Sequence, residues 1–354
     1  MRILLITEEA PPGPTGGIGV FYADLAAALE AAGVTVRLLV AKAAPRSGKT
    51  AALAGRWKFY REARRAVLDF RPDVIETHDW AGPLQAAPGH PLVVRMHGAH
   101  GALRKTPSRF WSALERRTLL AADAHVAVSS WIARRTTHRL NLDTTPTVLP
   151  SGIDTQMFRP SQEPSNLSEI LFVGSPRKDK GLAELFGAAE QVFGDRPWAT
   201  LTLAGATESE LPCPIPASIR GRVRCLGRVP REVLPTLYGR AAVVVCPSHA
   251  EAFGLSALEA AACGSAVIAS RRGGADEWLE HGRNGLLTDP FDPAETAREL
   301  AQLLDRPRLR IRLGQAARQT AVEQFDLAHV AGRNLRFYED LLRQWEVAAR
   351  STAA

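Results

Sequence analysis

Short apolar runs alternate with amphipathic stretches from the first residues of the chain onward. Arg2–Thr7 is an apolar run, a glycine-rich loop follows, and apolar residues then recur at helical spacing between positions 21 and 32. Gly33 stands where such a helix would end, and residues 34–40 form a second apolar run. This order is a βαβ unit, which predicts a parallel sheet. Further apolar runs that fit the same sheet lie at residues 73–77, 91–98, 124–129 and 146–153.

The same pattern starts again after a polar, proline-rich segment at residues 158–168, which is the best candidate for a linker. Beyond it, a helix is predicted at Leu182–Phe193, and the tail Leu327–Arg350 has the pattern of an amphipathic helix. Strands that alternate with helices on both sides of a linker predict an α/β protein with two doubly wound domains, for which 354 residues are sufficient. The apolar runs after the linker lie at residues 169–175, 199–205, 222–227, 241–248 and 265–270.

The chain carries 44 Lys and Arg against 37 Asp and Glu, a net charge of +7, and most of the excess lies in one region. Residues 101–140 hold eight Lys and Arg against Glu115 and Asp123, a local charge of +6. Such a patch suits nucleic acid, an anionic membrane surface or a phosphorylated substrate, and a solvated face explains it equally well. Stacking aromatics are sparse there, so no nucleic-acid partner is expected. The partly amphipathic stretch 108–120 could instead rest on anionic lipid or grip an anionic acceptor.

The four cysteines give no sign of a metal site or of disulfide bonds. They show no C-x-x-C pairing and no matching histidine spacing, so we expect unpaired thiols in a reducing compartment and no bound metal. The apolar run at the N-terminus is too short for a signal peptide, and no stretch approaches the length of a membrane span. We therefore expect a cytoplasmic protein, with peripheral membrane contact through residues 101–140 left open.

A glycine-rich loop at Pro14–Tyr22 lies directly after the first predicted strand. The dinucleotide-binding pattern G-x-G-x-x-G fails in it, and the next strand does not end in an acid, so a nicotinamide cofactor is not expected. The loop contains Gly16 and Gly17. It is either a turn that needs a positive φ or a segment that closely approaches a phosphate or a sugar.

A second loop, Phe172–Gly181, also joins a predicted strand to a predicted helix. It carries three cations, Arg177, Lys178 and Lys180. Helix starts normally prefer acids, so cations at this place suit a bound diphosphate better than a solvated surface. In the first half, His97 follows the end of an apolar strand, where ligands bind in open α/β sheets, although a single histidine can equally be a structural hydrogen-bonding group.

Two acids, Glu251 and Glu259, stand eight residues apart around a predicted helix start. Eight helical steps cover roughly 12 Å, which is too far for two carboxylates to share a proton but suits the two ends of an elongated ligand. A nucleotide sugar fits this spacing: Glu259 would accept hydrogen bonds from the ribose, and Glu251 would accept them from the sugar. Backbone amides near Gly254 and Leu255 would meet phosphate or sugar. The alternative is an exposed acid beside an acid that the helix dipole favours.

These motifs together resemble the family 4 glycosyltransferases of the GT-B fold, over nearly the whole chain. The strongest block is Cys246–Leu287, CPSHAEAFGLSALEAAACGSAVIASRRGGADEWLEHGRNGLL. The resemblance implies two Rossmann-like domains that face a cleft: residues 1–160 on the acceptor side, joined by a crossing helix at 336–354, and residues 161–335 binding the donor. It also implies a nucleotide-sugar donor, transfer with retention at the anomeric carbon, and no metal or other cofactor.

The resemblance assigns roles to particular residues. Glu259 looks like the ribose ligand, Glu251 like the acid at the donor sugar, and Lys180 like the lysine that binds the diphosphate. His97 looks like the histidine beside the transferred sugar. The remaining donor-binding positions are Gly16 and Gly17 in the closing loop, Arg177, and the stretch Phe253, Gly254 and Leu255. The family usually has Arg directly after the glycine of the strand that ends at Gly174, and here Ser175 takes that place. Either Arg177 bends back to replace that charge, or diphosphate binding is weaker.

Retention favours attack on the same face as departure, because no carboxylate in the first half is well placed for a covalent intermediate; Asp79 is the nearest. A UDP-sugar is favoured over a GDP-sugar. A natural-product aglycone, a glycan precursor and a lipid-linked acceptor all stay open. Two alternative functions are a sugar-nucleotide epimerase and a nucleotide-sugar-binding protein without catalysis.

Overall fold

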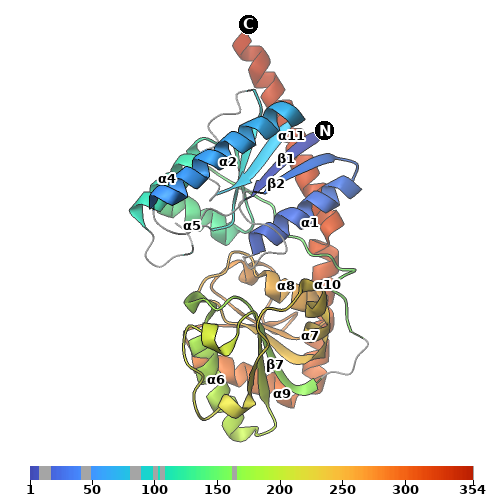
Figure 1. The fold of residues 1–354 in the computed structure, drawn as a ribbon. Helices are drawn as coiled ribbons and strands as arrows, with labels where there is room; N and C mark the ends of the chain where they lie inside the picture. The colour runs from blue at the N-terminus through green and yellow to red at the C-terminus, as the bar shows by residue number, and fades with distance from the viewer. Residues whose placement is uncertain are drawn as a thin grey trace. The chain divides into compact units, whose positions relative to one another are not determined.

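A computed structural model describes residues 1–7, 17–40, 49–79, 89–98, 103, 108–161 and 166–353 of the chain (Figure 1). These residues form two compact units, Met1–Gly152 with Leu327–Ala354, and Ile153–Asp326. The chain therefore passes from the first unit to the second after Gly152 and returns after Asp326.

The first unit is built on a six-stranded parallel sheet with the strand order β2-β1-β3-β4-β5-β6. Its strands are β1 (Arg2–Thr7), β2 (Thr35–Val40), β3 (Val74–His78), β4 (Leu92–Met96), β5 (Ala124–Ala127) and β6 (Thr147–Val148). Its helices include α1 (Gly17–Ala31), α2 (Lys49–Phe70), α4 (Arg109–Leu120), α5 (Ser130–Leu140) and α11 (Leu327–Ala353).

Both faces of this sheet are covered, which is why its central strands are apolar runs and not alternating ones. The connection from β1 to β2 runs across the sheet in the opposite direction to the later connections. Because such crossovers are right-handed, α1 lies on one face and α2, α4 and α5 lie on the other. The last helix, α11, packs beside α1, and together they bury residues such as Ile3, Leu5 and Leu25 (Figure 1).

The second unit repeats this plan with the order β12-β11-β10-β7-β8-β9, again all parallel. Helices α6 and α9 pack together over one face, and α8 packs with α7 and α10 over the other. The strands are β7 (Asn166–Val173), β8 (Thr200–Ala204), β9 (Val223–Cys225), β10 (Ala241–Cys246), β11 (Val267–Ser270) and β12 (Leu286–Thr288). The helices include α6 (Leu182–Asp195), α7 (Leu234–Arg240), α8 (Leu255–Ala262), α9 (Pro293–Asp305) and α10 (Pro307–Phe325).

The prediction of two doubly wound parallel sheets is confirmed. The transitions between units lie at 152/153 and 326/327, where the sequence had suggested 160/161 and 335/336. The reason is that the start of the proline-rich segment packs inside the second unit. Phe158 is fully buried there, and Arg318 donates a hydrogen bond of 2.8 Å to its carbonyl oxygen.

Candidate functional site

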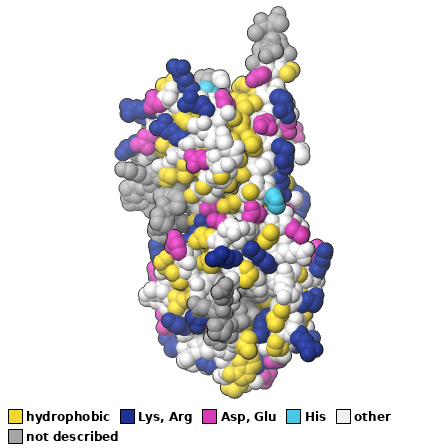
Figure 2. Space-filling model, turned by 90° about the vertical axis from the view of Figure 1, so that its right-hand side faces the viewer, with side chains coloured by type: hydrophobic (Ala, Val, Ile, Leu, Met, Phe, Trp, Pro, Cys, Tyr) yellow, Lys and Arg dark blue, Asp and Glu magenta, His cyan; other side chains and the backbone are white. Residues whose placement is uncertain are grey.

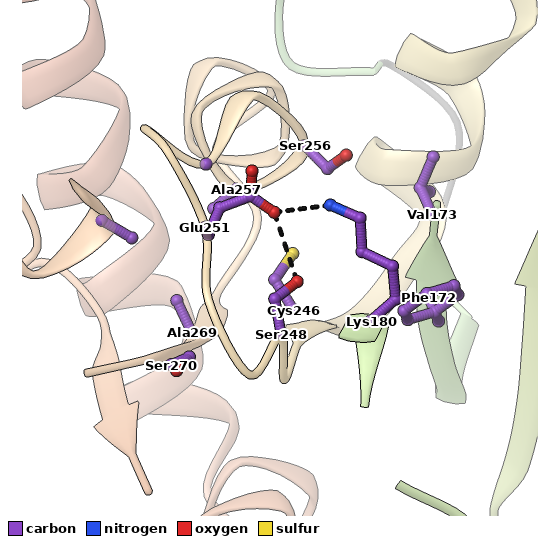
Figure 3. A pocket seen from close by; sticks show the side chains of 12 residues that line it. Phe172, Val173, Lys180, Cys246, Ser248, Glu251, Ser256, Ala257, Ala269 and Ser270 are labelled. Atoms are coloured by element: carbon purple, nitrogen blue, oxygen red, sulfur yellow. Dashed lines mark hydrogen bonds and ion pairs between the residues drawn. The ribbon is translucent and has the colours of Figure 1, made fainter. Parts of the chain in front are cut away.

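A pocket opens in the second unit at the point where the strand order reverses. From β7 the chain moves to β8 on one side, whereas from β10 it moves to β11 on the other, so the loops after β7 and β10 diverge and leave a crevice. The carboxyl ends of β7, β10 and β11 and the start of α8 line this pocket (Figure 3). Its polar lining includes Lys180, Ser248, Glu251 and Ser256.

An ion pair between Lys180 and Glu251 lies in this pocket. Lys180 Nζ donates to Glu251 Oε2 at 2.6 Å, and Ser248 Oγ donates to the same oxygen at 3.2 Å (Figure 3). The two side chains remain 23% and 26% exposed. Burial alone would raise the pKa of Glu251, but the charge and hydrogen bond of Lys180 and the hydrogen bond of Ser248 bring that pKa below its ordinary value. Glu251 is therefore a carboxylate at neutral pH.

Two glycines give the pocket its shape. Gly181 has φ +74°, and a Cβ there would stand 2.0 Å from the Pro247 carbonyl oxygen, so only glycine lets the Lys180 loop lie against the end of β10. Gly254, with φ +91°, precedes the first residue of α8, Leu255, and no side chain caps this helix. The amides of the first turn of α8 are thus available for an anion beside the pocket.

Phe253 has a different position from the one expected of a donor-binding residue. It is 4% exposed and does not line the pocket. Its ring packs edge-on against Phe325 at 5.5 Å, and its carbonyl oxygen accepts a hydrogen bond of 3.2 Å from Trp278 Nε1. Phe253 therefore anchors the loop that carries Glu251 and Gly254.

Arg177 lies in the same loop as Lys180 but points to another partner. Its guanidinium contacts both carboxylate oxygens of Asp179 and is 57% exposed. Burial would raise the pKa of Asp179, but the hydrogen bonds and charge of Arg177 lower it. Ser175 and Lys178 are both exposed. Of the three cations in this loop, Lys180 is therefore the one whose side chain lines the pocket.

Glu259, the second acid of the spaced pair, lies on α8, is 8% exposed and is not among the residues that line the pocket. Tyr238 Oη donates to Glu259 Oε2 at 2.8 Å. The sequence did not single out Tyr238, because a tyrosine in a helical pattern is indistinguishable from an ordinary core residue.

His97 lies in the first unit, directly after β4, and is 7% exposed. Its backbone N–H and that of Gly98 donate to Asp79 Oδ2 at 3.1 and 3.0 Å. Its ring packs edge-on against Phe21 at 4.9 Å, and its Nε2 has no hydrogen-bond partner among the described residues. Burial, and then the charges of Arg95 and His78, lower the pKa of His97 well below its ordinary value, so the imidazole is neutral at pH 7.

Beneath His97 lies a charged network that the sequence analysis missed. Arg95 donates to both carboxylate oxygens of Glu76, at 2.7 and 3.1 Å, and both residues are fully buried. Tyr338 Oη, from α11, donates to Glu76 Oε2 at 2.7 Å, and Asn334 Oδ1 accepts from Arg95. The sequence does contain a sign of this pair: Glu76 interrupts one apolar strand and Arg95 interrupts the next, and an acid and a base in such positions are expected to form an ion pair.

The other predicted positions add little to the geometry. Gly17 begins α1 and is exposed, whereas Gly16 lies outside the described residues, as do residues 101, 102 and 104–107 of the basic region.

Among the described residues, no group of His, Cys, Asp and Glu could hold a metal ion, and no helix is both long and apolar enough to cross a membrane. Cys246 lines the pocket, and burial together with the charge of Glu251 raises the pKa of its thiol to about 12.

Comparison with known proteins decides the family. The profile described as "Glycosyltransferase Family 4" matches residues 15–157, and the profile "Glycosyl transferases group 1" matches residues 154–320. The alpha-maltose-1-phosphate synthase of Mycolicibacterium smegmatis is 32% identical over 96% of this chain and 99% of its own. The chain belongs to the family 4 glycosyltransferases. Glycosyl transfer is therefore its reaction class, rather than epimerisation or binding without turnover.

Solved structures agree on the fold. The sucrose-phosphate synthase of Thermosynechococcus elongatus has a TM-score of 0.82 at 22% identity, covering 97% of this chain and 99% of its own. Anabaena Alr3699/HepE, solved in complex with UDP-glucose, has a TM-score of 0.75 at 21% identity, covering 96% and 100% of the two chains. The predicted GT-B fold is thereby confirmed.

Proposed function

We propose that this glycosyltransferase moves a sugar from a nucleotide-sugar donor, a UDP-sugar by preference, to a hydroxyl acceptor with retention. The observation that carries the proposal is the Lys180–Glu251 pair, 2.6 Å apart, at the switch point of the second sheet. A donor needs a cation for its diphosphate and an acceptor of hydrogen bonds for its sugar hydroxyls, and this pair provides both in one pocket.

Each of the predicted site residues is then assigned a role. Lys180 and the first amides of α8, after Gly254, bind the diphosphate, while Glu251 accepts hydrogen bonds from the sugar. Glu259 accepts hydrogen bonds from the ribose. As the family resemblance implies, we also assign His97 to the transferred sugar, and Gly16, Gly17 and Arg177 to the diphosphate.

Same-face attack is the proposed route. The bond from the acceptor oxygen to the anomeric carbon forms as the bond from that carbon to the phosphate oxygen breaks, and the leaving diphosphate takes the acceptor proton. Lys180 stabilises the charge that develops on the diphosphate. Asp79 does not suit a covalent route, because it is fully buried and accepts hydrogen bonds from two backbone N–H groups.

The relatives' names suggest substrates. Alr3699/HepE was solved with UDP-glucose, which supports a UDP-sugar as the donor here. Two proteins similar to this chain are named a maltose-1-phosphate synthase and a sucrose-phosphate synthase, so their products carry a phosphate. We therefore place phosphorylated sugars first among the acceptors, ahead of aglycones, glycan precursors and lipid-linked acceptors.

Release of free nucleotide from UDP-, GDP- and ADP-sugars, with and without phosphorylated acceptors, tests the proposal. We expect one UDP-sugar to turn over, Glu251→Gln to abolish that turnover, and NMR of the product to show the anomeric configuration of the donor. An inverted product would exclude retention. If every donor stays intact and none raises the melting temperature of the protein, the donor site is wrong.

A second proposal concerns the basic region, residues 101–140: the outer face of its helices α4 and α5, extended by α2, rests on an anionic lipid surface. Among the described residues of these helices, Asp69 is the one exposed acid. Trp57 and Leu68, 63% and 70% exposed, add apolar anchors. Figure 2 shows a face of the molecule on which acidic side chains are interspersed with the basic ones over much of the surface. The exposed cations are Lys58, Arg61, Arg64, Arg65, Arg109, Arg116, Arg117, Arg134 and Arg139.

Sedimentation with phosphatidylglycerol vesicles tests this contact. We expect binding at low salt that falls steeply with ionic strength, and loss of binding in Arg109→Glu/Arg134→Glu, which changes two exposed arginines of α4 and α5. The matched control is Arg308→Glu/Arg312→Glu, which makes the same charge change in the second unit. No sedimentation at low salt, or equal binding by both double variants, would exclude a lipid contact on this face.

A further inference from the structure

We infer that Tyr238 is a positioning residue for Glu259, and that it thereby sets the preference of the site for a ribonucleotide donor. This inference rests on the proposed role of Glu259 as the ribose ligand. Tyr238 has no role in the chemistry itself; it acts only through the carboxylate that it holds.

Tyr238 is fixed at both ends. Its hydroxyl donates to Glu259 Oε2 at 2.8 Å, and its backbone carbonyl oxygen accepts a hydrogen bond of 2.7 Å from Ser265 Oγ. The side chain is fully buried, and its ring lies 6.3 Å from that of Phe158. Helices α7 and α8 pack together, so the Tyr238–Glu259 bond links the two. The hydroxyl therefore has little freedom to move away from the carboxylate.

Glu259 depends on such a partner because it is only 8% exposed. Without hydrogen-bond donors, a buried carboxylate carries the whole free-energy cost of its desolvation, and its side chain can also adopt other rotamers. A carboxylate offers about four lone-pair positions. The Tyr238 hydroxyl bound to Oε2 therefore restrains the orientation of the group, and a carboxylate can also accept a hydrogen bond from a ligand hydroxyl. A carboxylate held in one orientation can accept hydrogen bonds from the vicinal hydroxyls of a ribose at a lower entropic cost.

The tyrosine also connects to the pocket. Ser256 lines the pocket and interacts with the Tyr238 hydroxyl. Burial, and then the charge of Glu259, raise the pKa of Tyr238 well above its ordinary value, so its hydroxyl is protonated and can donate at neutral pH. Tyr238 thus connects Ser256, in the wall of the pocket, to the carboxylate of Glu259.

The chain offers a matched control for testing this role. Tyr338 is also fully buried, and its hydroxyl donates to the buried carboxylate of Glu76 at 2.7 Å, but in the first unit. Tyr238→Phe and Tyr338→Phe therefore remove the same atom and the same kind of hydrogen bond. A stability effect should appear in both variants, whereas an effect on ribose recognition should appear only in the first.

The experiment measures kcat and KM for the UDP-sugar and for its 2′-deoxyribose counterpart. We expect the wild type to prefer the ribonucleotide by about 10-fold or more, the range of a hydrogen bond to a charged group. Tyr238→Phe should raise the KM of the ribonucleotide about 10-fold with little change in kcat, and should bring the preference close to one. Tyr338→Phe should lower the melting temperature and leave the preference unchanged. The affinities of UDP and 2′-deoxy-UDP, measured well below the melting temperature, give the same comparison without turnover.

Glu259→Gln distinguishes a wrong role for Tyr238 from a wrong donor site. If it abolishes the ribose preference while Tyr238→Phe preserves it, Tyr238 only packs and the inference is wrong. If Glu259→Gln also preserves the preference, the proposed donor site itself is wrong. Loss of the preference in both variants, together with its retention in Tyr338→Phe, supports the inference.

Discussion

Two ion pairs of almost the same length lie in the two units, and their surroundings differ. Arg95 Nε and Glu76 Oε1 are 2.7 Å apart with neither side chain exposed, and Asn334, Tyr338 and other buried groups complete the network. Lys180 Nζ and Glu251 Oε2 are 2.6 Å apart, but about a quarter of each side chain is exposed and the pair lines a pocket. The two pairs thus differ in their surroundings and not in their length. A buried pair whose other hydrogen-bonding positions are filled by protein groups stabilises the fold, whereas a partly exposed pair that lines a pocket is available to a ligand.

The energetics of the two pairs should differ accordingly. Breaking a fully buried pair leaves one charge without water or partner, which costs about 3–5 kcal/mol. Water can solvate the survivor of a partly exposed pair, so the corresponding loss of stability is about 1 kcal/mol or less. Replacing one residue of the Arg95–Glu76 pair should therefore lower the stability of the first unit, whereas replacing Lys180 or Glu251 should mainly lower the activity.

The largest expected effect is that of Arg95→Met. It leaves Glu76 buried with a single described hydroxyl donor, so we expect the free energy of unfolding of the first unit to fall by about 3–5 kcal/mol. Denaturant unfolding, followed by a probe in that unit, measures the loss. Arg95→Met combined with Glu76→Leu should recover much of it, because no charge then remains buried. A loss below about 1 kcal/mol in the single variant would show that the pair is not structural.

The second effect is that of Lys180→Met on activity. Loss of a group that stabilises developing charge typically lowers the rate about 100- to 1000-fold, and we expect a loss of that size in kcat/KM with little change in melting temperature. Lys178→Met is the matched control, since Lys178 is an exposed lysine of the same loop that does not line the pocket. Equal small losses in both variants would remove the assignment of Lys180 to the diphosphate.

The sequence alone predicted the architecture well, for a physical reason. Strands buried on both faces are short apolar runs, and β1, β7 and β10 stand out between helical patterns. Lys180 and Glu251 were also found separately, because each follows the end of a strand. That they form an ion pair could not be predicted, since it depends on β7 and β10 being neighbours, a fact of strand order.

The missed features depend on packing between distant segments. Tyr338 is 262 residues from its partner Glu76, and nothing local marks it as part of a network. Phe253 was expected to contact the donor, but its side chain is buried and packs against the ring of Phe325, on α10. The first domain boundary was predicted at 160/161 and lies at 152/153. Proline and polar residues suggested a linker from residue 158 onward, but Phe158, at its start, is buried in the second unit.

The third prediction concerns pH and follows from His97, which burial, and then the charges of Arg95 and His78, keep neutral by lowering its pKa. Its pKa is about 6.5 in the unfolded chain and well below that in the folded protein. Below pH 6.5 the unfolded state therefore binds more protons, so stability falls as pH decreases, by at most about 1.4 kcal/mol per pH unit.

Unfolding measured between pH 6.5 and 5.5 checks this dependence. His97→Gln should flatten the loss of stability in that window. Identical slopes in the wild type and in His97→Gln would mean that His97 is accessible to protons in the folded state, and that its burial does not hold it neutral.

The smallest expected effect is that of Arg177→Ala, and it addresses the charge missing at Ser175. Arg177 is more than half exposed and already has Asp179 as a partner, so any contact with the diphosphate must replace an existing ion pair. The net gain from such an exchange near the surface is small. We expect Arg177→Ala to raise the KM of the donor about fivefold or less, and the change to shrink further at high salt.

Asp179→Asn sharpens this last test, because it frees Arg177 without removing its charge. If Arg177 reaches the diphosphate at all, Asp179→Asn should lower the donor KM, and adding Arg177→Ala to it should reverse that gain. A loss in Arg177→Ala as large as that in Lys180→Met would show the opposite: the loop would rearrange on donor binding, and Arg177 would fully replace the charge absent at Ser175. The open pair in the second unit would then be only one half of the diphosphate site.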